Sequence, residues 1–156
     1  MSSSVGADEF GGFWIRVVAT LIDSVLLLVI ILPINLAVYG REYFDSTALF
    51  VGPVDYLVTW VFPTIAVILF WINRAATPGK MAVGLRIADA RTGQNASPGQ
   101  LVGRYFGYFV SLLAIGVGFL WVAWDPKKQG FHDKLAGTVV IRRTRRQEQP
   151  SFEKPV

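Results

Sequence analysis

A long apolar stretch near the start of the chain limits what it can fold into. The apolar run extends from Phe13 to Val38, and no charged residue occurs between Ser24 and Tyr39. About 20 apolar residues in a helix are enough to cross the roughly 30 Å hydrocarbon core of a bilayer. The sequence therefore predicts a membrane-spanning helix rather than an ordinary soluble domain.

Two charged residues lie within this run, Arg16 and Asp23. Their spacing of seven residues is about two helical turns, so both side chains share one face of the helix. A charge at the centre of a membrane costs at least about 2.5–3.5 kcal/mol on insertion scales. We therefore expect each of these charges to meet a partner from elsewhere in the chain.

The composition is that of a small multi-span membrane protein made of one domain. Of the 156 residues, 53% are hydrophobic, and there is no cysteine. The lack of thiols excludes disulfide bonds and thiolate metal sites. His132 is the single histidine, and no pair of carboxylates at fixed spacing suggests hydrolysis. We therefore expect no enzyme activity, catalytic residue, cofactor or metal.

The uneven distribution of basic residues predicts the orientation in the membrane. Thirteen of the fifteen Lys and Arg residues lie at or after Arg74, whereas the loop from Gly40 to Asp55 carries only one. By the positive-inside rule, that loop lies outside, and the N-terminus and the basic C-terminal half lie in the cytoplasm. We expect a multi-pass protein of the inner (cytoplasmic) membrane.

Two further apolar segments follow the first. The second covers about Tyr56 to Ile72, and the third runs without charge from Tyr105 to Trp124. Both flanks of the third segment are basic, so both favour the cytoplasm. We therefore expect this segment to be broken or re-entrant at Gly116–Gly118, or to lie in the membrane plane. The alternative is that one basic flank is exported against the rule.

The predicted fold class is an all-α polytopic membrane protein with three apolar segments and a small cytoplasmic β-ribbon. The ribbon would pair residues 86–90 with residues 138–141, which show alternating and β-branched patterns respectively. Two unpaired loops against the membrane are the alternative. The expected organisation is a flexible tail at 1–12, a transmembrane domain at 13–142, and a basic, then polar, tail at 143–156.

Two short motifs predict helix starts. In Thr77-Pro78, a capping residue precedes a proline at the first helical position. Ser97-Pro98-Gly99-Gln100 has the spacing of a capping box. We expect a short helical turn after the first motif and a long helix after the second.

Basic residues on the predicted inner face can bind anionic lipid head groups, because each contributes about 1 kcal/mol near an anionic leaflet. The alternative is a stop-transfer flank that only sets the orientation. Beside a membrane segment, lipid is the expected partner and nucleic acid is not. The candidate head-group contacts are Lys80, Lys127, Lys128, Arg142, Arg143, Arg145 and Arg146.

Several motifs occur in the order seen in one known family. They are Arg16, Asp23, the segment from Thr77 to Asp89, Arg104, and the segment from His132 to Val140. Together they resemble the RDD family of bacterial membrane proteins, named for one Arg and two Asp, over residues 12–142. The resemblance implies that Arg16 is the family Arg, Asp23 its first Asp and Asp133 its second, with Asp125 as the alternative.

Three hypotheses for the buried charges are open at this point. In the first, Arg16 pairs with Asp133 and Asp23 with Arg104, and the two crossed pairs staple the helices. In the second, which the resemblance also suggests, these residues form a site for transport of a proton or monovalent cation, within a homo-oligomer. In the third, the protein is a scaffold or an anionic-lipid-binding subunit with a partner membrane protein. Further candidate site residues are Thr20, Asp55, Asp125 and His132.

Overall fold

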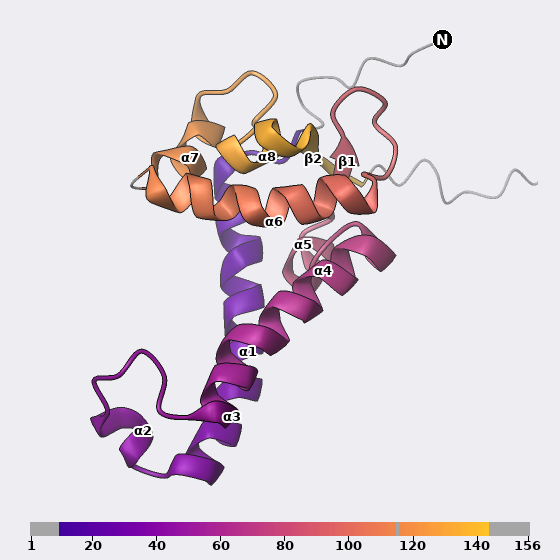
Figure 1. Cartoon of the computed structure of the whole chain (residues 1–156). Coiled ribbons are helices and arrows are strands. Elements are labelled where there is room, and N and C mark those ends of the chain that lie inside the picture. Colours follow the sequence, from indigo (N-terminus) through magenta and orange to yellow (C-terminus); the bar gives the residue numbers. More distant parts are fainter. Residues whose placement is uncertain (1–9, 115, 144–156) are drawn as a thin grey trace, which may run out of the picture.

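The computed structural model describes residues 10–114 and 116–143. The predicted contacts Arg145 and Arg146, and most of both predicted tails, lie outside these residues. Helices dominate the fold, and a two-stranded sheet lies at one end of the molecule (Figure 1). In chain order the elements are α1 (Phe13–Tyr39), α2 (Glu42–Asp45), α3 (Pro53–Tyr56), the π-helix η2 (Leu57–Val61), α4 (Phe62–Arg74), α5 (Pro78–Ala82), β1 (Leu85–Asp89), α6 (Pro98–Leu113), α7 (Val117–Leu120), the 3₁₀ helix η3 (Trp121–Ala123), α8 (Phe131–Ala136) and β2 (Thr138–Arg142).

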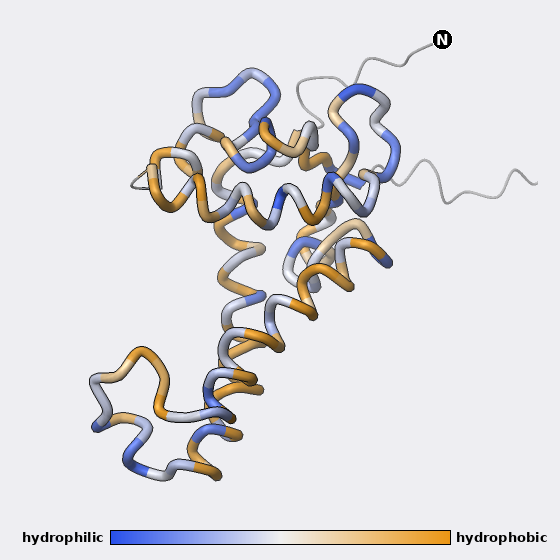
Figure 2. The backbone as a smooth tube through the Cα atoms, viewed as in Figure 1, coloured by the Kyte–Doolittle hydropathy of each residue, from blue (hydrophilic) through white to orange (hydrophobic). Residues whose placement is uncertain are grey.

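Helix α1 carries apolar side chains on all sides. Only Ala19 and Asn35 are buried in it, whereas Leu28 and Val29 are 56% and 67% exposed. A helix that is apolar all round belongs in a membrane or in the core of a large protein. Among the described residues, α1 and the stretch Pro53–Arg74 are long and apolar enough to cross a membrane. Figure 2 shows these two stretches as bands of hydrophobic residues.

The second apolar stretch is one continuous helical run made of α3, η2 and α4. Its π-helical turn, Leu57–Val61, lies directly before Phe62-Pro63. Proline has no N–H, and in a regular helix its ring clashes with the carbonyl four residues earlier. A wider turn at this point accommodates Pro63 without breaking the helix.

The third apolar segment is broken, as its two basic flanks predicted. The helix direction bends by 115° between α6 and α7–η3, and Gly116 at the break has a left-handed backbone with φ of 75°. Glycine adopts this conformation without the strain that a side chain would cause. Figure 1 shows α6 running across the direction of α1 instead of alongside it. The segment is therefore not one straight span.

Strands β1 and β2 form the predicted antiparallel ribbon. Their register pairs Leu85 with Arg142 and Asp89 with Thr138. The first strand thus begins and ends one residue earlier than the predicted 86–90. The alternative of two unpaired loops is wrong, because the two strands pair with each other along their whole length.

Two residues that the sequence placed in a flexible tail extend this sheet. Phe10 forms an antiparallel bridge with Ile141, and the Gly11 N–H donates to the Val140 carbonyl at 2.8 Å. The chain that leads into α1 is therefore attached to β2. This attachment holds the first turn of α1 beside the sheet.

The buried core lies at the sheet end of the molecule rather than along the two long helices. It combines side chains from both strands with the end of α4 and the start of α6. All of its members are less than 2% exposed: Trp71, Leu85, Ile87, Leu101 and Val140. Below, the cap means the two strands with α5 and α8, which gather at this end (Figure 1).

Candidate functional site

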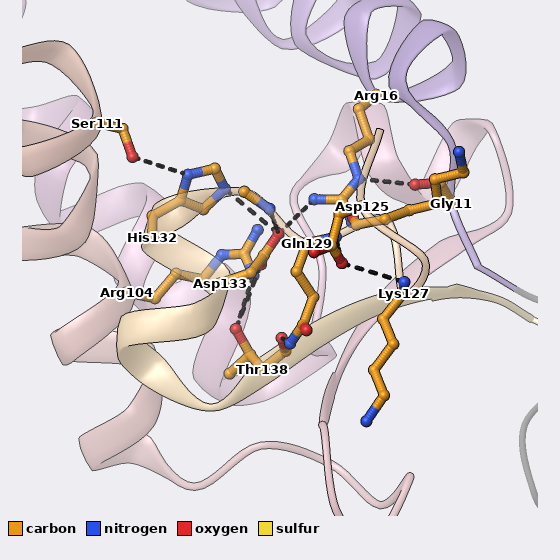
Figure 3. A network of polar contacts seen from close by, with 12 residues as sticks. Gly11, Arg16, Arg104, Ser111, Asp125, Lys127, Gln129, His132, Asp133 and Thr138 are labelled. Carbon is orange, nitrogen blue, oxygen red and sulfur yellow. Dashed lines mark hydrogen bonds and ion pairs between the residues drawn. The ribbon is translucent and has the colours of Figure 1, made fainter. Parts of the chain in front are cut away.

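Asp133 lies at the centre of a buried polar cluster in the cap (Figure 3). It belongs to the first turn of α8, where its Oδ2 accepts the Gly130 N–H at 3.1 Å. Arg16 Nη1 from α1 lies 2.6 Å from Asp133 Oδ2, and Arg104 Nη1 from α6 contacts Asp133 Oδ1. Both carboxylate oxygens therefore bind an arginine, and three helices meet at one side chain.

Further hydrogen bonds orient the two arginines. Arg16 Nε donates to the Gly11 carbonyl at 2.8 Å, and Arg104 Nη1 donates to Thr138 Oγ1 at 2.9 Å. Asp133 has no exposed surface, and Arg104 is 1% exposed. Away from water, attraction between opposite charges is stronger, and the loss of one partner costs more.

The two arginines determine the charge of Asp133. Burial alone would raise the pKa of Asp133, but the positive charges of Arg104 and Arg16 outweigh burial and hold this pKa far below its usual value. The carboxylate therefore stays ionised at every physiological pH. A group with so low a pKa does not take up and release protons near neutrality.

The structure brings Arg16 and Asp133 into contact, as the sequence predicted, but the predicted pair of Asp23 with Arg104 is wrong. Arg104 binds Asp133 as well. Asp23 instead accepts hydrogen bonds from Thr77 Oγ1 at 2.5 Å and from the Gly79 N–H at 2.7 Å. The structure therefore holds one carboxylate between two arginines, and not two crossed pairs.

Asp23 binds there because α5 begins beside it. The first N–H groups of a helix lack partners and carry partial positive charge, so a carboxylate is a good ligand for them. Gly79 allows the close approach, since a Cβ on this residue would lie 2.0 Å from the Ala19 carbonyl oxygen. The motif Thr77-Pro78 predicted this helix start, and its unsatisfied N–H groups were the signal for the partner of Asp23.

Two of the further candidates lie away from the cluster in the cap. The Thr20 hydroxyl donates to the Arg16 carbonyl at 2.9 Å, within α1. Asp55 lies near the other end of α1, where its Oδ1 accepts from Asn35 Nδ2 at 3.1 Å and from Thr59 Oγ1 at 2.6 Å. The sequence did not predict the roles of Asn35 and Thr59.

Asp125 orders the loop before α8. Its Oδ1 lies 2.6 Å from Lys134 Nζ, and its Oδ2 accepts the N–H groups of Lys127 and Gln129, both at 3.1 Å. Asp133, and not Asp125, is the carboxylate that contacts Arg16.

The predicted head-group contacts differ in their exposure. Lys127, Arg142 and Arg143 are exposed, and Lys128 is half-buried, with its carbonyl accepting a hydrogen bond from Arg16 Nη2. Lys80 is buried, with 8% exposure. It therefore does not belong to an exposed basic surface.

Comparison with known proteins identifies the family. The model of the RDD family matches residues 10–137, which include Arg16, Asp23 and Asp133. This chain belongs to the RDD family. The Bacillus subtilis (strain 168) protein YxaI is 33% identical to this RDD protein in an alignment 151 residues long that covers 86% of this chain and 98% of YxaI.

Other relatives match a smaller part of the RDD protein. RP437 of Rickettsia prowazekii is 35% identical over 75 residues, covering 48% of this chain and 41% of its own length. A proline-rich antigen homologue of Mycobacterium tuberculosis is 33% identical over 63 residues, covering 40% of this chain and 26% of its own length. No solved structure matches the chain.

His132 of the RDD protein is buried next to Asp133. Its Nδ1 lies 3.3 Å from Ser111 Oγ, and its Nε2 lies 3.5 Å from Asp133 Oδ2. Burial, and then the charge of Arg104, lower the pKa of His132 to about 3. The imidazole is therefore neutral near pH 7, and it packs as a polar aromatic ring 4.4 Å from the ring centre of Tyr108.

We expect the RDD protein to lose stability on acidification because of His132. An unfolded histidine titrates near 6.5 and the folded one at about 3, so the unfolded chain binds the extra proton between these values. The contribution of neutral His132 to the free energy of unfolding is fully present above about pH 6.5. It is lost as the pH drops toward 3, by roughly 1 kcal/mol per pH unit. Melting temperatures in detergent from pH 7 to pH 4 measure this loss. The fall should be smaller in His132→Gln, and equal falls in both proteins would contradict the assignment.

A partly open cavity of about 880 Å³ in the RDD protein is lined by α1, α4, α6 and α7, with Lys80 of α5 and His132 of α8 at its cap end. This volume is within the range of small-molecule sites. Along α1 its lining changes from charged to apolar. Arg16 lies at the cap end, and Leu27 lies about 16 Å further along the helix. Lys80 lines the cap end, where its Nζ lies 6.0 Å from the ring centre of Trp71. Burial lowers the pKa of Lys80.

Proposed function

We propose that this RDD protein is an integral membrane protein that binds anionic lipid at the cytoplasmic face and serves as a scaffold or subunit of a larger membrane complex. In this proposal the cluster around Asp133 staples α1, α6 and α8 together and carries no protons. It involves no catalytic residue and no cofactor. The observation that carries the proposal is the engagement of both Asp133 oxygens by arginines.

The geometry of the family carboxylates favours this function over proton exchange at the cap. An exchange site needs a carboxylate that alternates between a proton and a cation. Asp133 is bound by two arginines, and Asp23 is bound by Thr77 and the start of α5. Removing one partner from a buried charge pair costs about 3–5 kcal/mol, which opposes repeated release of Asp133.

Reconstitution and lipid analysis test this proposal. We expect the purified full-length protein to retain more anionic than zwitterionic phospholipid, relative to the membrane from which it was extracted. In vesicles with a pH-sensitive dye, proton flux should equal that of empty vesicles. No enrichment of anionic lipid would contradict lipid binding, and a saturable flux would contradict the absence of transport.

A cation or proton site near Asp55 is a second candidate function, and a specific observation favours it. Asp55 is 4% exposed, and among the described residues no basic side chain lies within 4.0 Å of it. Asn35 Oδ1, which is also buried, has no hydrogen-bond partner there. A buried carboxylate with no cation beside it suits a monovalent cation or a proton.

Flux measurements with one substitution decide this second candidate. If Asp55 carries ions, a sodium gradient should drive proton flux in vesicles, and Asp55→Asn should abolish it. Asp45→Asn is the control, because Asp45 is exposed in α2. Equal flux in both variants would exclude Asp55 from transport.

A further inference from the structure

Three residues at the cap end of the cavity carry hydrogen-bond donors without partners. The indole N–H of Trp71 and the Nε–H of Arg104 are buried and make no hydrogen bond within the described part of the chain. The Lys80 ammonium, on a residue 8% exposed, is not fully enclosed, and it forms no hydrogen bond or salt bridge with the described residues. These residues come from α4, α6 and α5 respectively, and all three line the cavity.

Both cationic side chains lie beside the Trp71 ring. Arg104 Cζ is 5.5 Å from the centre of the Trp71 ring, and Lys80 Nζ is 6.0 Å from it. Buried donors are nearly always satisfied, and an unsatisfied one costs about 1–3 kcal/mol. Two such donors next to the Lys80 ammonium indicate an acceptor that enters the cavity from outside the chain.

The charges around the cap end of the cavity also favour an anion. The charged groups there are the cations Arg16, Lys80 and Arg104 and the anions Asp23 and Asp133. When Lys80 is protonated, one positive charge is left over, in surroundings where a charge without a partner is costly. Burial also opposes the charged form of Lys80 and lowers its pKa, and a bound anion would act in the opposite direction.

The rest of the cavity suits an apolar chain. Away from the cap, its walls are apolar side chains of α1, α4 and α6, among them Leu27, Val67 and Leu112. These walls continue from the cationic end into the part of α1 that is long and apolar enough to cross a membrane. An occupant with an anionic head and an apolar tail matches both parts at once.

We infer that this cavity binds one anionic phospholipid, with its phosphate at Trp71, Lys80 and Arg104 and an acyl chain along α1 and α6. This inference rests on the proposed lipid-binding function and assigns it a site. The indole and guanidinium N–H groups and the ammonium would each donate to phosphate oxygens, as charge-assisted bonds for the two cationic groups. The site is distinct from the exposed basic residues near β2 and the loop before α8.

Lipid-dependent melting of purified variants tests the site. Dioleoyl phosphatidylglycerol added in detergent should raise the melting temperature of the wild type, and dioleoyl phosphatidylcholine should raise it less. Lys80→Met should weaken binding of phosphatidylglycerol at least tenfold, and Trp71→Phe about three- to tenfold, because each removes one donor. Native mass spectrometry of the same samples counts the bound lipids.

Two comparisons separate a lost site from a lost fold. Met fills the space of Lys without a charge, so Lys80→Met should melt at or above the wild-type temperature in the absence of lipid. Arg91→Met is the control, because it removes an exposed cation outside the cavity. It should bind phosphatidylglycerol like the wild type.

Each remaining outcome has a definite meaning. Unchanged phosphatidylglycerol binding in Lys80→Met and Trp71→Phe would overturn this site, while enrichment of anionic lipid by the wild type would leave the proposed function in place. Inorganic phosphate that stabilises the wild type as strongly as phosphatidylglycerol would overturn the lipid assignment. No phosphatidylglycerol binding by the wild type would overturn both.

Discussion

Replacing Asp133 with alanine is expected to lower the free energy of unfolding by about 3–5 kcal/mol, the largest effect that the structure predicts for one side chain. The substitution leaves Arg16 and Arg104 without the carboxylate that both of them bind. Arg104 is 1% exposed, so it cannot reach water unless α6 and α8 separate. Thermal or denaturant unfolding of the purified protein in detergent measures the change.

A control and a second substitution test the cause of this loss. Asp45→Ala removes an exposed carboxylate in α2 and should change stability by less than about 0.5 kcal/mol. If the cost arises from a buried unpaired cation, then adding Arg104→Met to Asp133→Ala should restore part of the stability. A double variant no more stable than Asp133→Ala would show that the arginine is not the source of the cost.

Gly79→Ala is expected to destabilise the protein by about 3 kcal/mol, at the upper end of the usual cost of overpacking. An added Cβ would lie 2.0 Å from the Ala19 carbonyl oxygen and 2.8 Å from Asp23 Cγ. Neither backbone nor carboxylate can move without separating α5 from α1. The hydrogen bonds of Asp23 to Thr77 and Gly79 would then be lost as well.

The chain contains a matched control for this substitution. Gly99 follows a capping residue and a proline in α6, as Gly79 does in α5, but a Cβ on Gly99 would meet nothing within 4 Å. Gly99→Ala should therefore stabilise the protein by about 0.4–1 kcal/mol, because alanine has fewer unfolded conformations to lose. Melting temperatures that fall equally in both variants would contradict the close packing of α5 on α1.

Local patterns in the chain were enough to predict most of the fold. The run from Phe13 to Val38 is a single helix, because about 20 consecutive apolar residues favour one long helix in lipid. The basic flanks of the third segment predicted its break at Gly116, and the β-branched run near Val139 predicted the second strand. The contact of Arg16 with Asp133 also followed from the sequence, since a buried charge needs a counterpart.

By itself, then, the sequence determined the apolar helices, the helix starts, the ribbon and the need for partners at Arg16 and Asp23. Only the tertiary structure decided which donors reach which carboxylate. Arg104 and the start of α5 were both chemically suitable for Asp23, but Gly79 brings α5 against α1 and supplies its N–H there. Such a choice depends on distances between backbones far apart in the chain, and packing sets these distances whereas local residue patterns do not.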